Sequence, residues 1–283
     1  MGDKKEDHMH YVALSRVRNL AGLQVLKLNE DKISVNPLVK QELERLRSDA
    51  QLNLCFKPVY NLPPDTIKLV FHNTRSLHKH IQDLKSCHLI QGAHIIGIAQ
   101  TRLMKSDSCH EYSLENYNIS RNDQTQVLPT RPAHGLLVYY HKDIQILSQK
   151  MYSKSTFEYV FQHLQLKGNE IQVITLYISP GCDAKSFKEG IQDLAHNIDE
   201  SLPFVLSGDT NVDFLNKEYG HKILFVENTL KCKQLMSKVT TNSQSILDHI
   251  YSNLENINTG SIDCYWSDHK IIYAAVPLSL CKR

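Results

Sequence analysis

The sequence predicts an α/β fold in which helices cover the faces of β-sheets. Short apolar runs rich in β-branched residues alternate along the chain with amphipathic runs of helical period, a pattern typical of this fold class. The chain has 283 residues, 41% of them hydrophobic, which is enough to bury a large core. We therefore expect one large domain, alone or with an appendage.

The elements of this domain are predicted to follow a loop that contains Pro58, Pro63 and Pro64. Alternating or continuous apolar runs predict strands, and apolar residues three or four apart predict helices. The predicted strands span residues 66–73, 93–100, 135–142, 159–167, 170–179, 203–211, 245–253 and 270–277, and the predicted helices span residues 76–87 and 185–198. A charged stretch at residues 36–52 predicts a helix before the loop. We therefore divide the chain into residues 1–57 and 58–283.

Charge and cysteine content narrow the class of protein. The net charge is +2, which excludes a gross polycation but leaves room for a local basic groove for nucleic acid. Seven cysteines are scattered without a C-x-x-C motif, so we expect neither a disulfide framework nor a zinc site. No apolar run is long enough to span a membrane, and the first residues lack the apolar core of a signal peptide. These features predict a nuclear or cytoplasmic protein that is neither secreted nor bound to membranes.

Polar side chains end or flank several predicted strands, which is where sites form in α/β folds. Gly208 is expected to allow a tight turn at one of these ends. Each polar residue alone could be a strand-end cap, but capping explains their joint occurrence poorly. The residues are Asn73, Gln100, Tyr177, Asp209, Asn211, Asp248, Asp268 and His269.

Two of these residues are expected to form a pair. Asp248 lies within the apolar run Ile-Leu-Asp-His-Ile, and a buried carboxylate is costly without a hydrogen-bond donor. His269 is a suitable donor. An aspartate that orients a histidine, beside acids able to hold a divalent cation, suits phosphodiester hydrolysis. The metal would stabilise negative charge in the transition state, and a further acid would position the attacking water.

Residues of about 65–277 resemble the endonuclease/exonuclease/phosphatase superfamily, which includes apurinic/apyrimidinic endonucleases and retrotransposon endonucleases. The resemblance implies a four-layer sandwich of two mixed β-sheets with helices outside. The strings Asn-Thr-Arg-Ser-Leu and Leu-Asp-His-Ile-Tyr-Ser-Asn favour the mobile-element branch. The matching strings are "HNTRSL", "IIGIAQTRL", "LYISP", "SGDTNVDF", "SILDHIYSN" and "WSDHK".

The same resemblance implies catalytic roles. His269 would contact the scissile phosphate and be oriented by Asp248. Asp209 would position or deprotonate the attacking water, and Asn211 would orient the phosphate. Tyr177 would lie against the phosphate as a hydroxyl donor.

The resemblance also implies a bound Mg²⁺ (or Mn²⁺), held by Asp268 with Asn73 nearby. The family has a glutamate as a metal ligand at the position of Gln100. Glutamine keeps a carbonyl oxygen but loses the negative charge that Mg²⁺ prefers. Two interpretations remain: a tolerated variant with reduced activity, or a decayed or repurposed nuclease.

The first fifty residues resemble a different family. The string "YVALSRVRNLAGLQVL" is similar to the last conserved motif of Pif-type DNA helicases, in which the arginine at the position of Arg16 reaches the γ-phosphate of ATP. The chain has no G-x-x-x-x-G-K-[ST] loop, so we interpret this part as the tail of a truncated helicase. A helicase end followed by such a nuclease resembles the Helitron-type transposon proteins. DNA and an upstream helicase portion are the expected partners.

Four functions therefore remain open. The first is a metal-dependent DNA endonuclease of transposon origin, and the second is an inactive DNA-binding remnant. A helicase-related ATPase is disfavoured by the missing phosphate loop, and a phosphatase of small substrates or lipids is disfavoured by the helicase tail.

Overall fold

The computed structural model describes residues 36–49, 62–90, 92–123, 133–154 and 156–281. The chain divides into two compact units, Met1–Phe56 and Lys57–Arg283. The described part of the first unit is the helix α2 (Pro37–Asp49), on which Leu38 and Leu43 are exposed. Arg16 and most of the predicted helicase tail lie outside the described residues.

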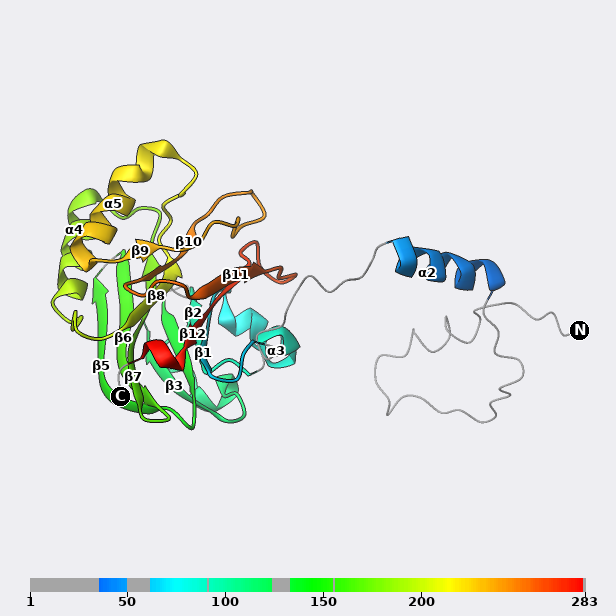
Figure 1. Ribbon diagram of the computed structural model, residues 1–283, viewed down its shortest axis with the longest axis horizontal. Helices are drawn as coiled ribbons and strands as arrows, with labels where there is room; N and C mark the ends of the chain where they lie inside the picture. Colours follow the sequence, from blue (N-terminus) through cyan, green and yellow to red (C-terminus); the bar gives the residue numbers. More distant parts are fainter. Residues whose placement is uncertain (1–35, 50–61, 91, 124–132, 155, 282–283) are drawn as a thin grey trace, which may run out of the picture. The chain divides into compact units, whose positions relative to one another are not determined.

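The second unit contains two six-stranded mixed sheets (Figure 1). In the first sheet the strand order is β11-β12-β1-β2-β4-β3, and in the second sheet it is β5-β6-β7-β8-β10-β9. The first sheet consists of β1 (Thr66–Asn73), β2 (Ile95–Ala99), β3 (Tyr117–Asn122), β4 (Leu136–His141), β11 (Asn258–Ile262) and β12 (Ile271–Pro277). The second sheet consists of β5 (Gln145–Lys154), β6 (Phe157–Leu166), β7 (Asn169–Ile178), β8 (Phe204–Asp209), β9 (Lys233–Gln234) and β10 (Asp248–Ser252).

Each sheet has one parallel pair of strands near its middle. β1 pairs with β2 and β7 pairs with β8 in parallel, whereas the other pairs among the described strands are antiparallel. A parallel pair needs a crossover, because the chain must return to the starting edge of the sheet. The helices α3 (Leu77–Ser86) and α4 (Ala184–Ala195) lie in these two crossovers. In each sheet, the carboxyl ends of the two parallel strands therefore lie at the same edge.

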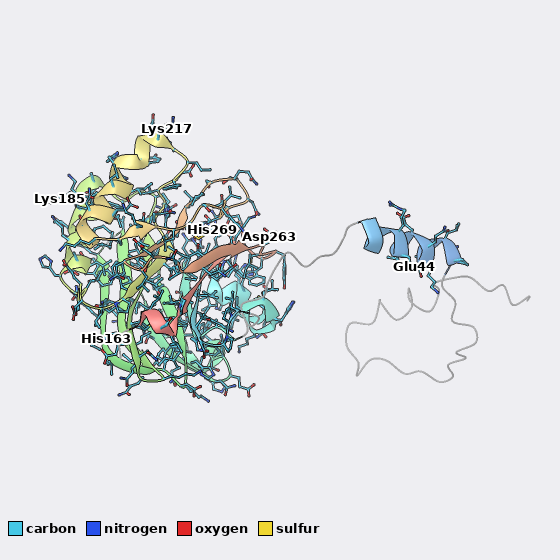
Figure 2. The ribbon with its side chains drawn as sticks, in the orientation of Figure 1. Glu44, His163, Lys185, Lys217, Asp263 and His269 are labelled. Atoms are coloured by element: carbon cyan, nitrogen blue, oxygen red, sulfur yellow. The ribbon has the colours of Figure 1, made fainter. Side chains whose placement is uncertain are left out.

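The two sheets pack face to face and enclose one apolar core. Leu69 and Val138 of the first sheet and Val173 and Val205 of the second are buried in the same hydrophobic cluster. The sheets approach closely at Gly97 of β2, where an added Cβ would lie 2.8 Å from the Thr175 side chain of β7. Figure 2 shows the described side chains on the ribbon, with His269 labelled.

Helices cover the outer faces of the sandwich. α4 and α5 (Gly220–Leu230) pack on the outer face of the second sheet, where Phe187, Ile191 and Val226 join Leu206 in a second apolar cluster. Figure 1 shows α3 on the opposite side of the sandwich, beside the first sheet. Two mixed sheets flanked by helices confirm the predicted four-layer sandwich.

The structure also contains elements that the sequence pattern did not predict, namely β3, β5, β9, β11 and α5. One residue is placed differently from the prediction. Gly208 lies inside β8 and not in a turn, and an added Cβ would lie 2.3 Å from the carbonyl oxygen of Leu176 on β7. Glycine is needed there because two strands approach closely, so the prediction of a tight turn was wrong.

Two further observations concern membranes and cysteines. None of the described helices has the length and apolar character needed to cross a membrane. The cysteines within the described residues are free of disulfide bonds.

Candidate active site

The predicted site residues come from both sheets and meet at one edge of the sandwich. Asn73 is the last residue of β1, and Gln100 follows the last residue of β2. Tyr177 lies near the end of β7, and Asp209 ends β8. The carboxyl ends of parallel strands lie at one edge of a sheet, so each parallel pair brings two of these side chains to one edge of its own sheet. The contacts of Asn73 with Asp209 and of Gln100 with Tyr177 show that the two edges lie side by side.

The antiparallel neighbours complete this arrangement. Asp248 is the first residue of β10, which runs antiparallel to β8. His269 lies just before β12 (Ile271–Pro277), which runs antiparallel to β1. An antiparallel strand begins at the edge where its neighbour ends, so these two residues arrive at the same place as Asp209 and Asn73.

A row of four polar residues crosses the second sheet. Glu158 pairs with Tyr177, Tyr177 pairs with Asp209, and Asp209 pairs with Asp248 in the register of the strands. Directly paired positions place their side chains on the same face of a sheet. Glu158 was not predicted as a site residue, although an acid in the apolar run Phe-Glu-Tyr-Val is a signal for it. It is fully buried and accepts a hydrogen bond from the backbone N–H of Gly135 at 3.0 Å.

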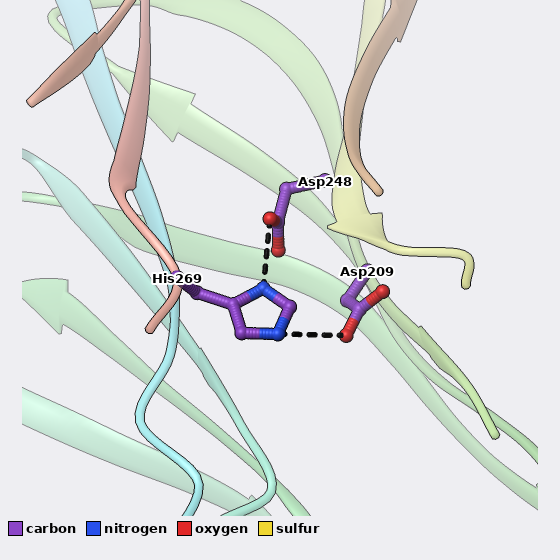
Figure 3. Close-up of side chains that lie close together, drawn as sticks. All are labelled: Asp209, Asp248 and His269. Atoms are coloured by element: carbon purple, nitrogen blue, oxygen red, sulfur yellow. Dashed lines mark hydrogen bonds and ion pairs between the residues drawn. The ribbon is translucent and has the colours of Figure 1, made fainter. Parts of the chain in front are cut away.

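His269 lies between two buried carboxylates, as Figure 3 shows. Its Nδ1 is 2.9 Å from Oδ2 of Asp248, and its Nε2 is 4.0 Å from Oδ2 of Asp209. The exposed fractions are 5% for His269, 1% for Asp209 and 0% for Asp248. The hydrogen bond between Asp248 and His269 expected from the sequence is therefore present, and it fixes the plane of the imidazole ring.

The electrostatics of these three groups are linked. Burial lowers the pKa of His269, but the charges of Asp248 and Asp209 outweigh this effect and raise that pKa to about 9. Burial and the charge of Asp248 raise the pKa of the Asp209 carboxyl, and His269 partly offsets the rise. A histidine that keeps its proton and a carboxyl that titrates above its ordinary range are thus adjacent.

Two asparagines hold Asp209 in position. Nδ2 of Asn73 donates to Oδ2 of Asp209 at 2.8 Å, and the backbone N–H of Asn211 donates to Oδ1 at 2.9 Å. Asn211 itself is in the left-handed region, with φ 51°, and its side-chain Nδ2 donates to the carbonyl of Ile178 at 2.7 Å. Both carboxylate oxygens of Asp209 therefore have a donor, one from the end of β1 and one from the loop that follows β8.

Gln100 contacts Tyr177 across the two sheets. Its Nε2 donates to the Tyr177 hydroxyl at 2.5 Å, so the NH₂ group is used within the protein. Burial raises the pKa of Tyr177 to about 12, and this tyrosine is therefore a neutral hydroxyl at ordinary pH. With φ 51°, the Gln100 backbone is in the left-handed region, which non-glycine residues seldom adopt.

Asp268 is the most exposed of the predicted acids and pairs with an arginine that was not predicted. Its Oδ1 is 2.8 Å from Nε of Arg75, and the side chains are 44% and 60% exposed, respectively. Arg75 lies two residues after Asn73, and its backbone N–H donates to Oδ1 of Asn73 at 3.0 Å. The metal ligand predicted from the sequence thus has a protein cation beside it.

The side chains predicted to hold Mg²⁺ or Mn²⁺ fit such an ion in kind but carry little charge. Asp268 offers a carboxylate, and Asn73 and Gln100 offer amide oxygens, which are the hard oxygen ligands that Mg²⁺ takes. Because Gln100 uses its NH₂ on Tyr177, its carbonyl oxygen is the atom left for a cation.

A second set of possible ligand atoms lies deeper. One ligand atom each of Asp209, Asp248 and His269 lies within 4.8 Å of the others. In that set Nδ1 of His269 is already bonded to Asp248. Asp268 and Gln100 of the predicted ligand set are partly exposed, whereas Asn73 is as buried as this second set.

Comparison with solved structures identifies the fold. The catalytic domain of human Nocturnin, solved with a bound sulfate anion, is 14% identical to this chain with a TM-score of 0.60, and the match covers 76% of this chain and 94% of that chain. An endonuclease/exonuclease/phosphatase family protein from Bacteroides thetaiotaomicron is 15% identical with a TM-score of 0.59, over 76% and 98% of the two chains. TDP2 from D. rerio, complexed with single-strand DNA product, is 13% identical with a TM-score of 0.56, over 74% and 98%.

The folded unit therefore has the endonuclease/exonuclease/phosphatase fold, as predicted. At the sequence level there is no comparable likeness, since no protein-family profile and no curated protein matches the chain. The Pif-type helicase and Helitron resemblances of the first fifty residues remain predictions.

Proposed function

We propose that this chain is a divalent-metal-dependent phosphodiester hydrolase that acts on DNA. The observation that carries the proposal is the convergence of Asn73, Asp209, Asp248 and His269, whose contacts join both sheets at one edge. Structures with the same fold include a phosphatase, the mannosyl-6-phosphatase of Bacteroides thetaiotaomicron, and TDP2 bound to a DNA product. Hydrolysis of a phosphate ester is the reaction for which this set of groups is chemically suited.

The proposed mechanism assigns a proton transfer to Asp209. Its carboxylate is held by Asn73 and by the backbone of Asn211, so it has a fixed direction. Burial brings its pKa towards neutrality, where a carboxylate accepts a proton from an attacking water more readily than at its ordinary pKa. Asp209 would therefore position and deprotonate the water.

His269 would contact the phosphate in its protonated form. Asp248 fixes the ring through Nδ1, which leaves Nε2 directed towards Asp209 and the space beside it. A positive donor stabilises the charge that develops on the phosphate oxygens. The neutral hydroxyl of Tyr177 and the amide of Asn211 would add further hydrogen bonds to these oxygens.

The residues that would hold Mg²⁺ or Mn²⁺ are Asp268, Asn73 and Gln100. When bound, such an ion supplies Lewis-acid stabilisation of negative charge on the phosphate and its leaving group. The charge of this ligand set rests on Asp268 alone, so we expect weak binding and low activity.

An exposed aromatic residue beside the site favours a nucleic-acid substrate over a small phosphate ester. The side chain of Tyr265 is 82% exposed and packs edge to face against Trp266, with ring centroids 4.9 Å apart. Both lie immediately before the segment that carries Asp268 and His269. Aromatic side chains at such positions stack on nucleobases in proteins that bind single strands.

A second candidate function is a DNA-binding protein that no longer cleaves. The neutral Gln100 at the expected acid position and the ion pair of Asp268 with Arg75 favour it, because both weaken the metal site. In that case DNA binding would persist and hydrolysis would be absent with any divalent metal.

The test is a plasmid-nicking assay with Mg²⁺ and with Mn²⁺, run on the unmodified chain and on Gln100→Glu. Asp209→Asn and His269→Gln serve as inactive controls. Nicking that both controls abolish supports the hydrolase. If the unmodified chain and Gln100→Glu both bind DNA but neither nicks it, the result supports a DNA-binding protein that no longer cleaves.

For residues 1–57 we propose the C-terminal part of a Pif-type helicase domain, as in Helitron-type transposon proteins, with the upstream helicase portion as a partner. Arg16 would then have no nucleotide to contact in this chain, because the phosphate-binding loop is absent. We also propose a nuclear or cytoplasmic location. ATP hydrolysis by the purified chain that Arg16→Ala abolishes would overturn the first proposal, and secretion of a tagged protein would overturn the second.

A further inference from the structure

We infer that Arg75 is an internal counterion for Asp268 that competes with a divalent cation for this carboxylate. The inference rests on the proposed function, since it takes Asp268 as a metal ligand. Arg75 would then set the affinity of the site for metal together with Gln100.

The first support is the contact itself. Nε of Arg75 lies 2.8 Å from Oδ1 of Asp268, so the two side chains form an ion pair, and this oxygen accepts no hydrogen bond from the described residues. Among the described residues, Arg75 is the ion-pair partner of Asp268. A cation that binds this oxygen must displace the guanidinium or share the carboxylate with it.

The second support is that the backbone of Arg75 is held in place. Its φ of 55° is in the left-handed region, which is unfavourable for a residue with a Cβ. The N–H of Arg75 donates to Oδ1 of Asn73, and Nδ2 of Asn73 donates to Asp209. The turn that carries Arg75 is therefore anchored to the site.

The third support is the charge of the predicted ligand set. Asn73 and Gln100 are neutral, so the negative charge of Asp268 is the charge available to a cation, and Arg75 balances it. Mg²⁺ binding by proteins depends on anionic oxygens. Gln100 and Arg75 thus both lower the affinity of the site for a divalent cation, because Gln100 replaces an anionic ligand and Arg75 places a positive charge beside the remaining one.

The position of the pair near the surface decides the size of the effect. With the two side chains 60% and 44% exposed, solvent screens much of the attraction. Removing the guanidinium should therefore strengthen metal binding by about threefold to tenfold and not by several orders of magnitude.

The experiment measures Mn²⁺ binding to the full chain without DNA, from the loss of the free Mn²⁺ signal in electron paramagnetic resonance. Arg75→Gln is the main variant, and Arg75→Gly is a second one because glycine tolerates the positive φ. The matched control is Lys154→Gln, which removes one positive charge from the pair of Lys154 with Glu189, where the side chains are 57% and 38% exposed. Both Arg75 variants should lower the Kd for Mn²⁺, and the control should leave it unchanged.

A second background tests whether Asp268 mediates the effect. In Asp268→Asn, the substitution Arg75→Gln should no longer strengthen Mn²⁺ binding. An equal gain in that background, or no gain from either Arg75 variant in the unmodified chain, overturns the inference. If Gln100→Glu strengthens binding while the Arg75 variants do not, the inference fails and the metal site stands. If no variant binds Mn²⁺, Gln100→Glu included, both the inference and the metal-dependent hydrolase are overturned.

Discussion

Asp209 and Asp248 lie directly opposite each other on the antiparallel strands β8 and β10, and His269 contacts both carboxylates. Two buried acids at paired positions repel each other when both are ionised. A protonated His269 supplies the compensating charge. The three groups therefore form one electrostatic unit, and a change in one must alter the proton affinity of the others.

Asp248→Asn should lower the pKa of His269 from about 9 towards the ordinary value of 6.5, since the charge and hydrogen bond of Asp248 raise it. It should also lower the pKa of Asp209, which the Asp248 charge raises. The measurement is the titration of the His269 ring by NMR in the metal-free protein, with the resonance assigned by its loss in His269→Gln. An unchanged His269 pKa in Asp248→Asn would show that the hydrogen bond does not control the ring.

The same shifts define the pH dependence of stability. The folded pKa of His269 lies above its unfolded value, so its contribution is fully present below pH 6.5 and is lost as pH rises through about 9. The raised pKa of Asp209 acts in the same direction, because the folded state loses stability as that carboxyl ionises. The stability advantage of the unmodified chain over Asp248→Asn should therefore shrink as pH rises. Urea unfolding at several pH values measures it, and an advantage that grows with pH contradicts the assignment.

Gly208→Ala should destabilise the fold strongly. The added Cβ would lie 2.3 Å from the carbonyl oxygen and 2.7 Å from the Cβ of Leu176. Leu176 cannot move away freely, because its strand β7 is paired with β6 on one side and with β8 on the other. We expect a loss of about 3 kcal/mol in the free energy of unfolding, as for an overpacked core. Gly181→Ala is the control, since a Cβ there meets nothing within 4 Å. Equal urea midpoints for the two variants would refute the close approach of the strands.

The sequence predicted the central strands because they are apolar along their whole length, as at Thr66–Asn73 and Phe204–Asp209. It did not predict the edge strand Gln145–Lys154, whose sequence is polar because one side of the strand and most of its side chains face water. The helix Gly220–Leu230 was missed as well, since its pattern of apolar residues is less regular. Whether such segments form a strand or a helix depends on packing against residues far along the chain, and the local sequence pattern does not contain that information.

In the candidate site as well, the sequence pattern predicted some residues and missed those that depend on contacts between distant segments. Strand-end polar residues such as Asn73 and Asp209 could be identified because they follow apolar runs. Arg75 could not, because its importance comes from its contact with Asp268 in a distant segment. Glu158 was likewise missed, since its place in the row with Tyr177 depends on the register of β6 against β7.

Tyr177→Phe should separate catalysis from folding. The ring remains buried, and the loss is one hydroxyl that accepts a hydrogen bond from Gln100. The free energy of unfolding should fall by only about 1 kcal/mol, the usual net value of one hydrogen bond. Loss of a hydrogen bond to the charged phosphate should slow nicking by roughly tenfold to a hundredfold, corresponding to about 1.5–3 kcal/mol. Thermal melting and nicking rates measure the two effects, and parallel losses in both would assign Tyr177 a structural role only.

Gln100→Glu should increase nicking at millimolar Mg²⁺. The substitution returns an anionic oxygen to the predicted ligand set, and the Tyr177 hydroxyl can donate to it in place of the present contact. A gain of a few kcal/mol in transition-state stabilisation corresponds to a rate increase on the order of 10²–10³-fold. Gln100→Ala should change the rate little, because the amide oxygen that it removes is a neutral and therefore weak ligand for Mg²⁺. DNA binding should be similar in all three proteins, since the phosphate-contacting groups are the same, and gel-shift assays beside the nicking assay check this.

If the unmodified chain nicks DNA as fast as Gln100→Glu, charge at this position does not limit the reaction and another group holds the metal. Glu158, which pairs with Tyr177 across β6 and β7, is then the first carboxylate to substitute.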